Sequence, residues 1–160
     1  MIYNIKIFPK YILLQEEQML TKLNPYINFK NNARQAMEFY HGVFGGNLKM
    51  QTFKEYHASQ NPSEDDLIMH AELDGNDCMT LMASDTPSGM EYRPGTNVSL
   101  SLSGDSTFEE QLKTIFDKLS RGGKITQPME KAIWGDIFGM CTDKFGINWL
   151  VNIAAPKNVM

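Results

Sequence analysis

Three histidines are the side chains of this sequence best suited to move a proton near neutral pH, because an unperturbed imidazole titrates there. His41 falls in a helix-like segment and His57 in a loop-like one, so we expect both to be surface residues. His70 lies in LIMHAEL, where strand alternation puts it on one face with Ile68 and Glu72. On that face His70 is the candidate catalytic group, as a general base or hydrogen-bond donor. The alternative, a buried histidine bonded to a neighbour or a dimer contact, stays open.

The two cysteines, Cys78 and Cys141, are the second group that could do chemistry. Both lie in strand-like segments, lack a Cys-x-x-Cys spacing and have no base beside them in the sequence. Buried, reduced thiols are therefore expected rather than a disulfide or a reactive thiolate. No spacing in the chain indicates a Ser-His-Asp or Cys-His arrangement.

The composition is that of an ordinary globular protein. Of 160 residues, 42% are hydrophobic and 21% are charged, which argues against a disordered or fibrous chain. The net charge of -4, without a cluster of lysines and arginines, argues against nucleic acid or an anionic membrane as a partner. No apolar run reaches the roughly 20 residues that span a bilayer, and no signal-like segment is visible. With the unpaired thiols, these features predict a cytoplasmic protein.

The segment 1–18 is atypical and fits neither of the repeats described next. One codon choice for Gln15 to Gln18, CAG-GAG-GAA-CAA, contains AGGAGG shortly before Met19, as a bacterial ribosome-binding site would. We therefore expect 1–18 to be an extension upstream of the natural start, and 19–160 to be a single domain. A genuine edge strand or flexible arm is the alternative.

The rest of the chain repeats one pattern. LNPYINF is strand-like, NNARQAMEFYHGVFGG has apolar residues at helical spacing, and three strand-like segments follow: NLKMQTF, DDLIMHAEL and CMTLMAS. After a linker punctuated by proline and glycine, 84–95, the order returns in NVSLSLS, TFEEQLKTIFDKLSRGG, GKITQPME, DIFGMCT and GINWLVN. The sequence predicts an α+β fold of two βαβββ modules, at about 23–84 and about 96–153.

Two signals set the correspondence between the modules. A Gly-Gly pair follows each helix-like segment, and an Asp-led turn, DGND or DKFG, precedes each last strand. We align the two turns by their first residues, Asp74 and Asp143. In this alignment Leu81 corresponds to Leu150.

This order, with NPYINFKNNARQAMEFYHGVFGG, LIMHAEL, LMASD, NVSLSLSGD, WGDIFGM and DKFGINWLVN, resembles the PhnB-like branch of the vicinal oxygen chelate (glyoxalase/bleomycin resistance/dioxygenase) superfamily. The resemblance covers Leu23 to Asn152. It implies that each module curls its sheet into half of a cup around a cavity, frequently across a homodimer. Members often carry the label of a demethylubiquinone methyltransferase. No glycine-rich strand-to-helix turn such as GxGxxG supports a nucleotide-type cofactor here.

For metal-dependent relatives, the resemblance implies His, Glu or Gln ligands on the first and last strands of each module. Here the first-strand position matches Asn24, give or take a residue, and the second module offers Asn97 and serines. The last-strand positions match Leu81 and Leu150, which are aliphatic. Amides, hydroxyls and aliphatic groups bind transition metals poorly, so we predict no metal, and we expect no other cofactor.

The sequence therefore predicts a metal-independent protein that binds a small organic ligand and forms a homodimer. The predicted ligand-binding residues are Asn24, Tyr26, Asn28, His70, Ser99, Ser101, Trp134 and Asn148. For Trp134, a ligand wall and a plain core tryptophan are both open. Two other functions are also open: a metal-dependent lyase, isomerase or dioxygenase with ligands such as His70 and Glu72, and a non-catalytic partner protein that assembles through its sheet faces.

Overall fold

The structure is a computed structural model, and it describes residues 22–75 and 79–156. The segment 1–18, predicted to be an upstream extension, lies outside the described residues. Cys78 lies outside them as well.

The described residues of module one form one α-helix and four strands. The helix and strands are β1 (Tyr26–Phe29), α1 (Ala33–Phe44), β2 (Asn47–Thr52), β3 (Ile68–Asp74) and β4 (Thr80–Asp85). A short 3-10 helix, η1 (Pro62–Glu64), lies in the connection from β2 to β3. The sheet order is β1-β4-β3-β2, with β1 parallel to β4 and the other pairs antiparallel.

Module two repeats this connectivity. Its elements are β5 (Leu100–Asp105), η3 (Ser106–Phe108), α2 (Glu109–Ser120), β6 (Lys124–Lys131), β7 (Ile137–Thr142) and β8 (Asn148–Ala154). Its sheet order is β5-β8-β7-β6, again with the first and last strands parallel. The predicted α+β fold, with βαβββ written twice, is confirmed.

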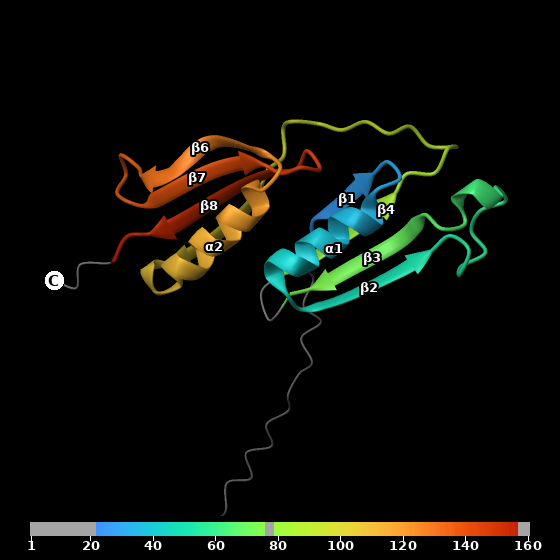
Figure 1. Cartoon of the computed structure of the whole chain (residues 1–160), viewed down its shortest axis with the longest axis horizontal. Helices are drawn as coiled ribbons and strands as arrows, with labels where there is room; N and C mark the ends of the chain where they lie inside the picture. Colours follow the sequence, from blue (N-terminus) through green and yellow to red (C-terminus); the bar gives the residue numbers. More distant parts are fainter. Residues whose placement is uncertain (1–21, 76–78, 157–160) are drawn as a thin grey trace, which may run out of the picture.

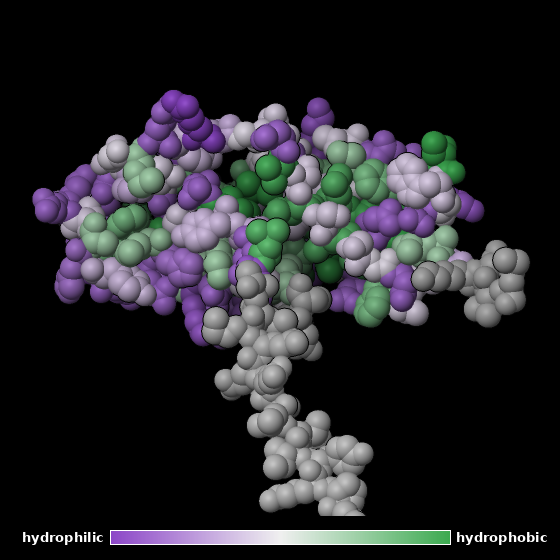
Figure 2. Space-filling model, turned by 180° about the vertical axis from the view of Figure 1, so that it is seen from behind, coloured by the Kyte–Doolittle hydropathy of each residue, from purple (hydrophilic) through white to green (hydrophobic). Residues whose placement is uncertain are grey.

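Both helices lie on one face of the molecule, each across its own sheet (Figure 1). The linker 86–99 runs from the end of β4 to the start of β5 along one edge (Figure 1). Figure 2 shows the molecule from behind: hydrophobic residues gather in its middle around a hollow, whereas hydrophobic and hydrophilic residues are mixed towards the two ends. Neither α1 nor α2 covers the opposite face of its sheet (Figure 1), and the hollow lies on that side of the molecule (Figure 2).

One hydrophobic core runs through both modules, because each helix turns an apolar stripe towards its sheet. The buried helical residues are Ala33, Ala36, Met37, Tyr40 and Val43 of α1 and Leu112, Phe116 and Leu119 of α2. Cys141 belongs to this core, as predicted for a buried thiol, and burial raises its pKa to about 11. It therefore stays a protonated, unreactive thiol near neutral pH.

Asp143 joins the two modules through hydrogen bonds inside this core. Its side chain is buried, and Oδ2 accepts hydrogen bonds from the Tyr40 hydroxyl of α1 (2.7 Å) and the Trp149 indole N–H (2.8 Å). Oδ1 accepts the backbone N–H groups of Phe145 (2.8 Å) and Ile147 (3.0 Å). Burial, and then the neighbouring carboxylate, raise the pKa of Tyr40 far above its usual range. The buried charge is thus fully hydrogen-bonded, partly by the other module.

The two hairpins before the last strands correspond one residue away from the predicted alignment. The N–H of Gly75 donates to the carbonyl of Met79 (2.9 Å), and the N–H of Asp143 donates to that of Ile147 (2.9 Å). Asp143 therefore corresponds to Gly75 and not to Asp74. The two aspartates occur in turns of similar sequence but occupy different positions: Asp74 lies one residue before the position that Asp143 occupies.

For this reason the prediction that Leu81 occupies the last-strand position equivalent to Leu150 is wrong. Leu81 pairs with Leu73 and is 2% exposed, inside the core, as is its counterpart Trp149. Met82, half-buried on the other face of β4, corresponds to Leu150. A slip of one residue moves a strand side chain to the opposite face of the sheet.

Gly46 and Gly123, from the two predicted Gly-Gly pairs, have the same role in both modules. A Cβ added to Gly46 would lie 2.3 Å from the carbonyl oxygen of Asp74, and one added to Gly123 would lie 2.2 Å from that of Thr142. Only a glycine allows the chain to pass so close to the strand end.

A β-bulge in β3 changes the faces predicted around His70. Ile68 pairs with Thr52 and His70 pairs with Gln51, which leaves Met69 without a partner. Ile68 is buried in the core, so the prediction that it shares a face with His70 is wrong. The bulge interrupts the alternation on which that prediction was based.

Candidate functional site

A cavity of about 890 Å³ lies where the two modules and the linker meet. Its wall comes from β1, the end of β4, the linker, the start of β5 and the β7–β8 turn with the start of β8, together with Phe53 and Met69. Of the predicted ligand-binding residues, Tyr26, Asn28 and Asn148 line it. The cavity therefore brings together residues separated by more than a hundred positions in the chain.

Asn28 and Asn148 are each held by a hydroxyl from the neighbouring strand. Ser84 Oγ donates to Asn28 Oδ1 (3.2 Å), and the two residues pair across β1 and β4. Thr142 Oγ1 donates to Asn148 Oδ1 (2.8 Å), and these residues pair across β7 and β8. Both carboxamides are thus positioned by the sheets rather than by mobile loops.

His70 forms a pair with Tyr26 instead of standing in the cavity wall by itself. The Tyr26 hydroxyl and His70 Nδ1 lie 3.3 Å apart in a hydrogen bond, and the rings stack with centroids 5.9 Å apart. Tyr26 lines the cavity and is 47% exposed, while His70 is half-buried. The imidazole is therefore connected to the cavity wall through the tyrosine hydroxyl.

Besides His70, four predicted residues are not part of the cavity wall. Asn24 precedes β1 and is half-buried, and Ser99 precedes β5 and is exposed. Ser101 is exposed on β5, opposite Leu150. Trp134 is 59% exposed in the β6–β7 connection and packs edge-to-face on Phe138, so it is not a core tryptophan.

The linker supplies residues of the wall that the sequence analysis missed. Met90, Tyr92 and Arg93 line the cavity, and Arg93 forms an ion pair with Glu91 (2.6 Å). The signal in the sequence was the presence of a methionine, a tyrosine and an arginine in GMEYRPG. A segment interrupted by proline and glycine has no periodicity, so the sequence does not show which side chains face a site. The linker is thus one wall of the site as well as a connection.

A buried carboxylate, Glu64, holds the first part of the linker. Its Oε1 accepts the backbone N–H of Ser88 (2.8 Å), and its Oε2 accepts the Ser59 hydroxyl (2.8 Å). Hydrogen bonds from Ser88, and then from Ser59, keep the pKa of Glu64 below its usual range. The N–H of Thr86 donates to the carbonyl of Phe29 (2.8 Å), which fixes the linker at the end of β4.

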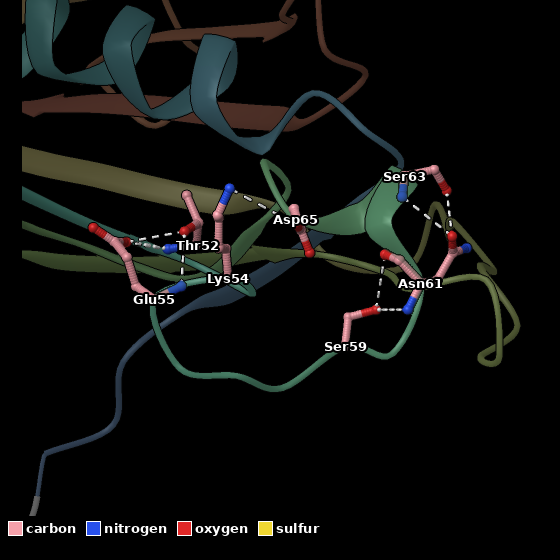
Figure 3. A network of polar contacts seen from close by, with 7 residues as sticks. All are labelled: Thr52, Lys54, Glu55, Ser59, Asn61, Ser63 and Asp65. Carbon is pink, nitrogen blue, oxygen red and sulfur yellow. Dashed lines mark hydrogen bonds and ion pairs between the residues drawn. The ribbon is translucent and has the colours of Figure 1, made fainter.

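The β2–β3 connection beside the linker is organised by short-range polar contacts (Figure 3). The Glu55 carboxylate accepts the backbone N–H of Thr52 (2.6 Å), and this bond lowers the pKa of Glu55. Asn61 Oδ1 accepts the backbone N–H of Ser63 (3.1 Å) and caps η1. These contacts anchor the segment that carries Phe53, another residue of the cavity wall.

The strand positions that the family resemblance assigns to metal ligands do not fit a metal. On the last strands, Met82 and Leu150 face away from the helices, and Leu150 pairs with Ser101 of β5. On β1, Tyr26 pairs with Met82. Between 22 and 156, apart from 76–78, no group of three or more His, Cys, Asp or Glu side chains could hold a metal ion. A thioether, an aliphatic group, a phenol and a hydroxyl are a poor ligand set for Zn, Ni, Fe or Mn.

Among the described residues, no helix is both long enough and apolar enough to cross a membrane.

Comparisons with known proteins support the fold and the family. The family described as 3-demethylubiquinone-9 3-methyltransferase matches residues 21–152. Protein YjdN of Escherichia coli (strain K12) is 32% identical, and the match covers 84% of this chain and 97% of YjdN. The crystal structure of PA1353 from Pseudomonas aeruginosa has a TM-score of 0.72 at 33% identity, over 86% of this chain and 100% of that one.

Two solved structures of lower identity support the fold alone. The PhnB protein of Bacillus cereus has a TM-score of 0.67 at 24% identity, over 84% of this chain and 100% of that one. A member of the glyoxalase/bleomycin resistance protein/dioxygenase superfamily from Sphaerobacter thermophilus has a TM-score of 0.52 at 17% identity, over 84% and 98%.

Proposed function

Since the chain belongs to the PhnB-like 3-demethylubiquinone-9 3-methyltransferase family and has the glyoxalase/bleomycin resistance fold, we propose that it is a metal-independent protein that binds a small organic molecule. The observation that carries this proposal is the cavity of about 890 Å³. Small-molecule sites typically measure about 300–1,000 Å³ and combine an apolar wall with a few polar groups. Here Tyr26, Tyr92 and Met90 supply apolar surface, and two carboxamides supply polarity.

Metal independence rests on the chemistry of the strand positions described above. Met82 and Leu150 offer no carboxylate or imidazole that could bind a transition metal. A second function has one observation in its favour: His70 and Glu72 lie two residues apart on β3, and His70 is hydrogen-bonded to Tyr26. His70 and Glu72 would then be metal ligands at non-standard positions in a metal-dependent lyase, isomerase or dioxygenase. Elemental analysis of protein purified without chelators distinguishes the two, because a stoichiometric transition metal would contradict metal independence.

The family description names a methyltransferase, and the residues of this chain do not fit the nucleotide-type cofactor of that activity. The turn between β1 and α1 is Lys30-Asn31-Asn32, without the glycines that let a backbone approach a nucleotide. Each sheet has a single parallel pair of strands, whereas nucleotide-binding folds of the doubly wound type are built on parallel sheets. We therefore expect no binding of S-adenosylmethionine in the ligand screen described below.

A homodimer is part of the proposal. Apolar residues on or beside the cavity stay exposed in one copy: Tyr26 is 47%, Met90 67% and Val98 69% exposed. A second copy that covers them would exclude water from the ligand and strengthen its polar contacts. Light scattering coupled to size-exclusion chromatography is expected to give twice the mass of one chain. A cytoplasmic location stays a prediction from the sequence.

A thermal-shift screen against a broad set of metabolites tests the binding function. A ligand that binds only the native state raises the melting temperature by mass action. Tyr26→Ala removes an aromatic wall of the cavity, and Tyr56→Ala removes a tyrosine of similar exposure, 53%, that does not line it. The shift of a true ligand should shrink in Tyr26→Ala and persist in Tyr56→Ala. If no metabolite gives a shift, the proposal fails in favour of a protein that only assembles with partners.

A further inference from the structure

The two carboxamides of the cavity are both turned the same way. Ser84 gives its hydroxyl hydrogen to Asn28 Oδ1, and Thr142 gives its hydroxyl hydrogen to Asn148 Oδ1. In both hydrogen bonds the carboxamide oxygen faces the hydroxyl of the neighbouring strand, so each –NH₂ group, with its two hydrogens, lies on the other side of its carboxamide. The –NH₂ groups of Asn28 and Asn148 therefore supply donors at the cavity wall, beside the Tyr26 hydroxyl, which can donate or accept.

Asp85 and Glu91, the carboxylates of the wall, do not compete for these donors. Asp85 is buried, and its two oxygens accept the backbone N–H groups of Ala33 and Ile68, both at 2.9 Å. Glu91 is paired with Arg93, whose side chain is 76% exposed. A guanidinium has five N–H donors, more than one carboxylate uses, so Arg93 retains donors for a second acceptor.

From this arrangement we propose that the cavity selects ligands that carry a hydrogen-bond acceptor with negative charge, a carboxylate in the first instance, on an apolar body. The acceptor is bound by the –NH₂ groups of Asn28 and Asn148 with support from Arg93, and the apolar body lies against Tyr26, Tyr92 and Met90. This inference rests on the proposed binding function and names its ligand class. Amines of the same shape are disfavoured, because an ammonium group is a donor only and would meet other donors.

The test compares two probes of equal shape, 4-phenylbutyrate and 4-phenylbutylamine, by isothermal titration calorimetry. The decisive variant is Asn148→Asp. It keeps the Oδ1 that accepts from Thr142 and replaces the –NH₂ group by an anionic oxygen, so the fold can be retained while the donor is inverted. Gln111→Glu introduces the same charge on the exposed side of α2, away from the cavity, and is the matched control.

We expect the wild type to bind 4-phenylbutyrate and to bind 4-phenylbutylamine at least about tenfold more weakly. In Asn148→Asp the affinity for 4-phenylbutyrate should fall about tenfold to hundredfold, the range of one hydrogen bond to a charged group, and the affinity for the amine should rise. Gln111→Glu should leave both affinities unchanged. The melting temperature of Asn148→Asp without ligand checks that the protein folds, and Asn28→Asp repeats the test from β1.

The outcomes separate this inference from the function on which it rests. If both probes bind equally, or Asn148→Asp and Asn28→Asp leave the preference unchanged, the donor inference is wrong while the binding function stands. If neither probe binds but the metabolite screen finds a ligand without an acceptor, the donor inference is again overturned. If neither the probes nor the screen show binding, both proposals fail.

Discussion

Module one and module two each bury a carboxylate, but the two carboxylates bind different partners. Asp85 accepts backbone N–H groups from Ala33, at the start of α1, and Ile68, at the start of β3, and so ties module one to itself. Asp143 accepts two N–H groups of its own turn and, in addition, the hydroxyl of Tyr40 from module one. The strands and the glycines after the helices repeat, whereas the buried charges do not. The partners of each buried carboxylate therefore depend on which other elements surround it in the complete fold, and the repeat alone does not predict them.

Asp143→Asn should have the largest effect on stability. The new –NH₂ group replaces one of the two carboxylate oxygens. It then faces either the Tyr40 hydroxyl and the Trp149 N–H, or the two backbone N–H groups of the turn. Leaving buried donors without an acceptor costs about 1–3 kcal/mol each, so we expect the free energy of unfolding to fall by roughly 3 kcal/mol or more. Urea denaturation followed by circular dichroism measures it.

Two variants control this prediction. Asp74→Asn makes the same change at the exposed aspartate of the other hairpin and should alter stability by less than about 0.5 kcal/mol. Tyr40→Phe removes only the donor from module one and should cost about 1.5–3 kcal/mol. Equal effects of Asp143→Asn and Asp74→Asn would mean that the buried carboxylate does not join the modules.

Gly46→Ala and Gly123→Ala test what the two modules share. Each added methyl group would lie within 2.3 Å of a strand-end carbonyl oxygen, so each variant should lose roughly 1–3 kcal/mol. Gly46 has a φ of 90°, which adds about 1 kcal/mol for a residue with a side chain. Gly89→Ala, in the linker with no atom within 4 Å of the added carbon, should be neutral. If only one of the two variants lost much stability, the two glycines would not have the same structural role.

Asp85→Asn should destabilise the protein less than Asp143→Asn. One carboxamide oxygen can still accept from Ala33 or Ile68, which leaves a single N–H group facing the new –NH₂. We expect a loss of about 1–3 kcal/mol in the same urea measurement. If Asp85→Asn proved the more damaging of the two, the bonds within module one would outweigh those between the modules.

Glu64 adds a third carboxylate to the comparison, one that ties module one to the linker, and its effect should be the smallest and should depend on pH. Because its pKa in the folded protein is lowered from 4.5, its contribution to stability is present above that value and is lost as the pH falls through the folded pKa. The amide proton of Ser88, which donates to this carboxylate, should therefore shift in NMR spectra with a midpoint below pH 4.5. Glu64→Gln should abolish that titration, and a midpoint above pH 4.5 would contradict the assignment.

The strands and helices could be predicted from sequence because each carries its own periodicity. The apolar residues of α1 recur at helical spacing, and a Gly-Gly pair follows each helix, so short stretches of sequence were enough to predict these elements. The correspondence between the last strands could not, because an aspartate suits more than one position of a turn, and aligning Asp74 with Asp143 moved Leu81 to the wrong face.

The candidate site was predictable only where it lies on regular strands. Asn28 and Asn148 follow from alternation, and both line the cavity. The linker residues do not, since no period relates Tyr92 or Arg93 to a face of the fold. The bulge at Met69 has no local sequence signal either, because it arises from the pairing of β3 with β2.

The contact between Tyr40 and Asp143 spans 103 positions of the chain, and this has a consequence for synthesis on the ribosome. A nascent chain that has emerged to Asp85 contains all strands of module one and can close that sheet. The aromatic side chains of α1 then still lack Phe145 and Trp149, against which Phe39, Tyr40 and Phe44 pack in the complete protein. We therefore expect a stalled chain that ends before 143 to expose aromatic side chains of α1 to solvent, because Phe145 and Trp149, which complete the packing of α1, have not yet been translated.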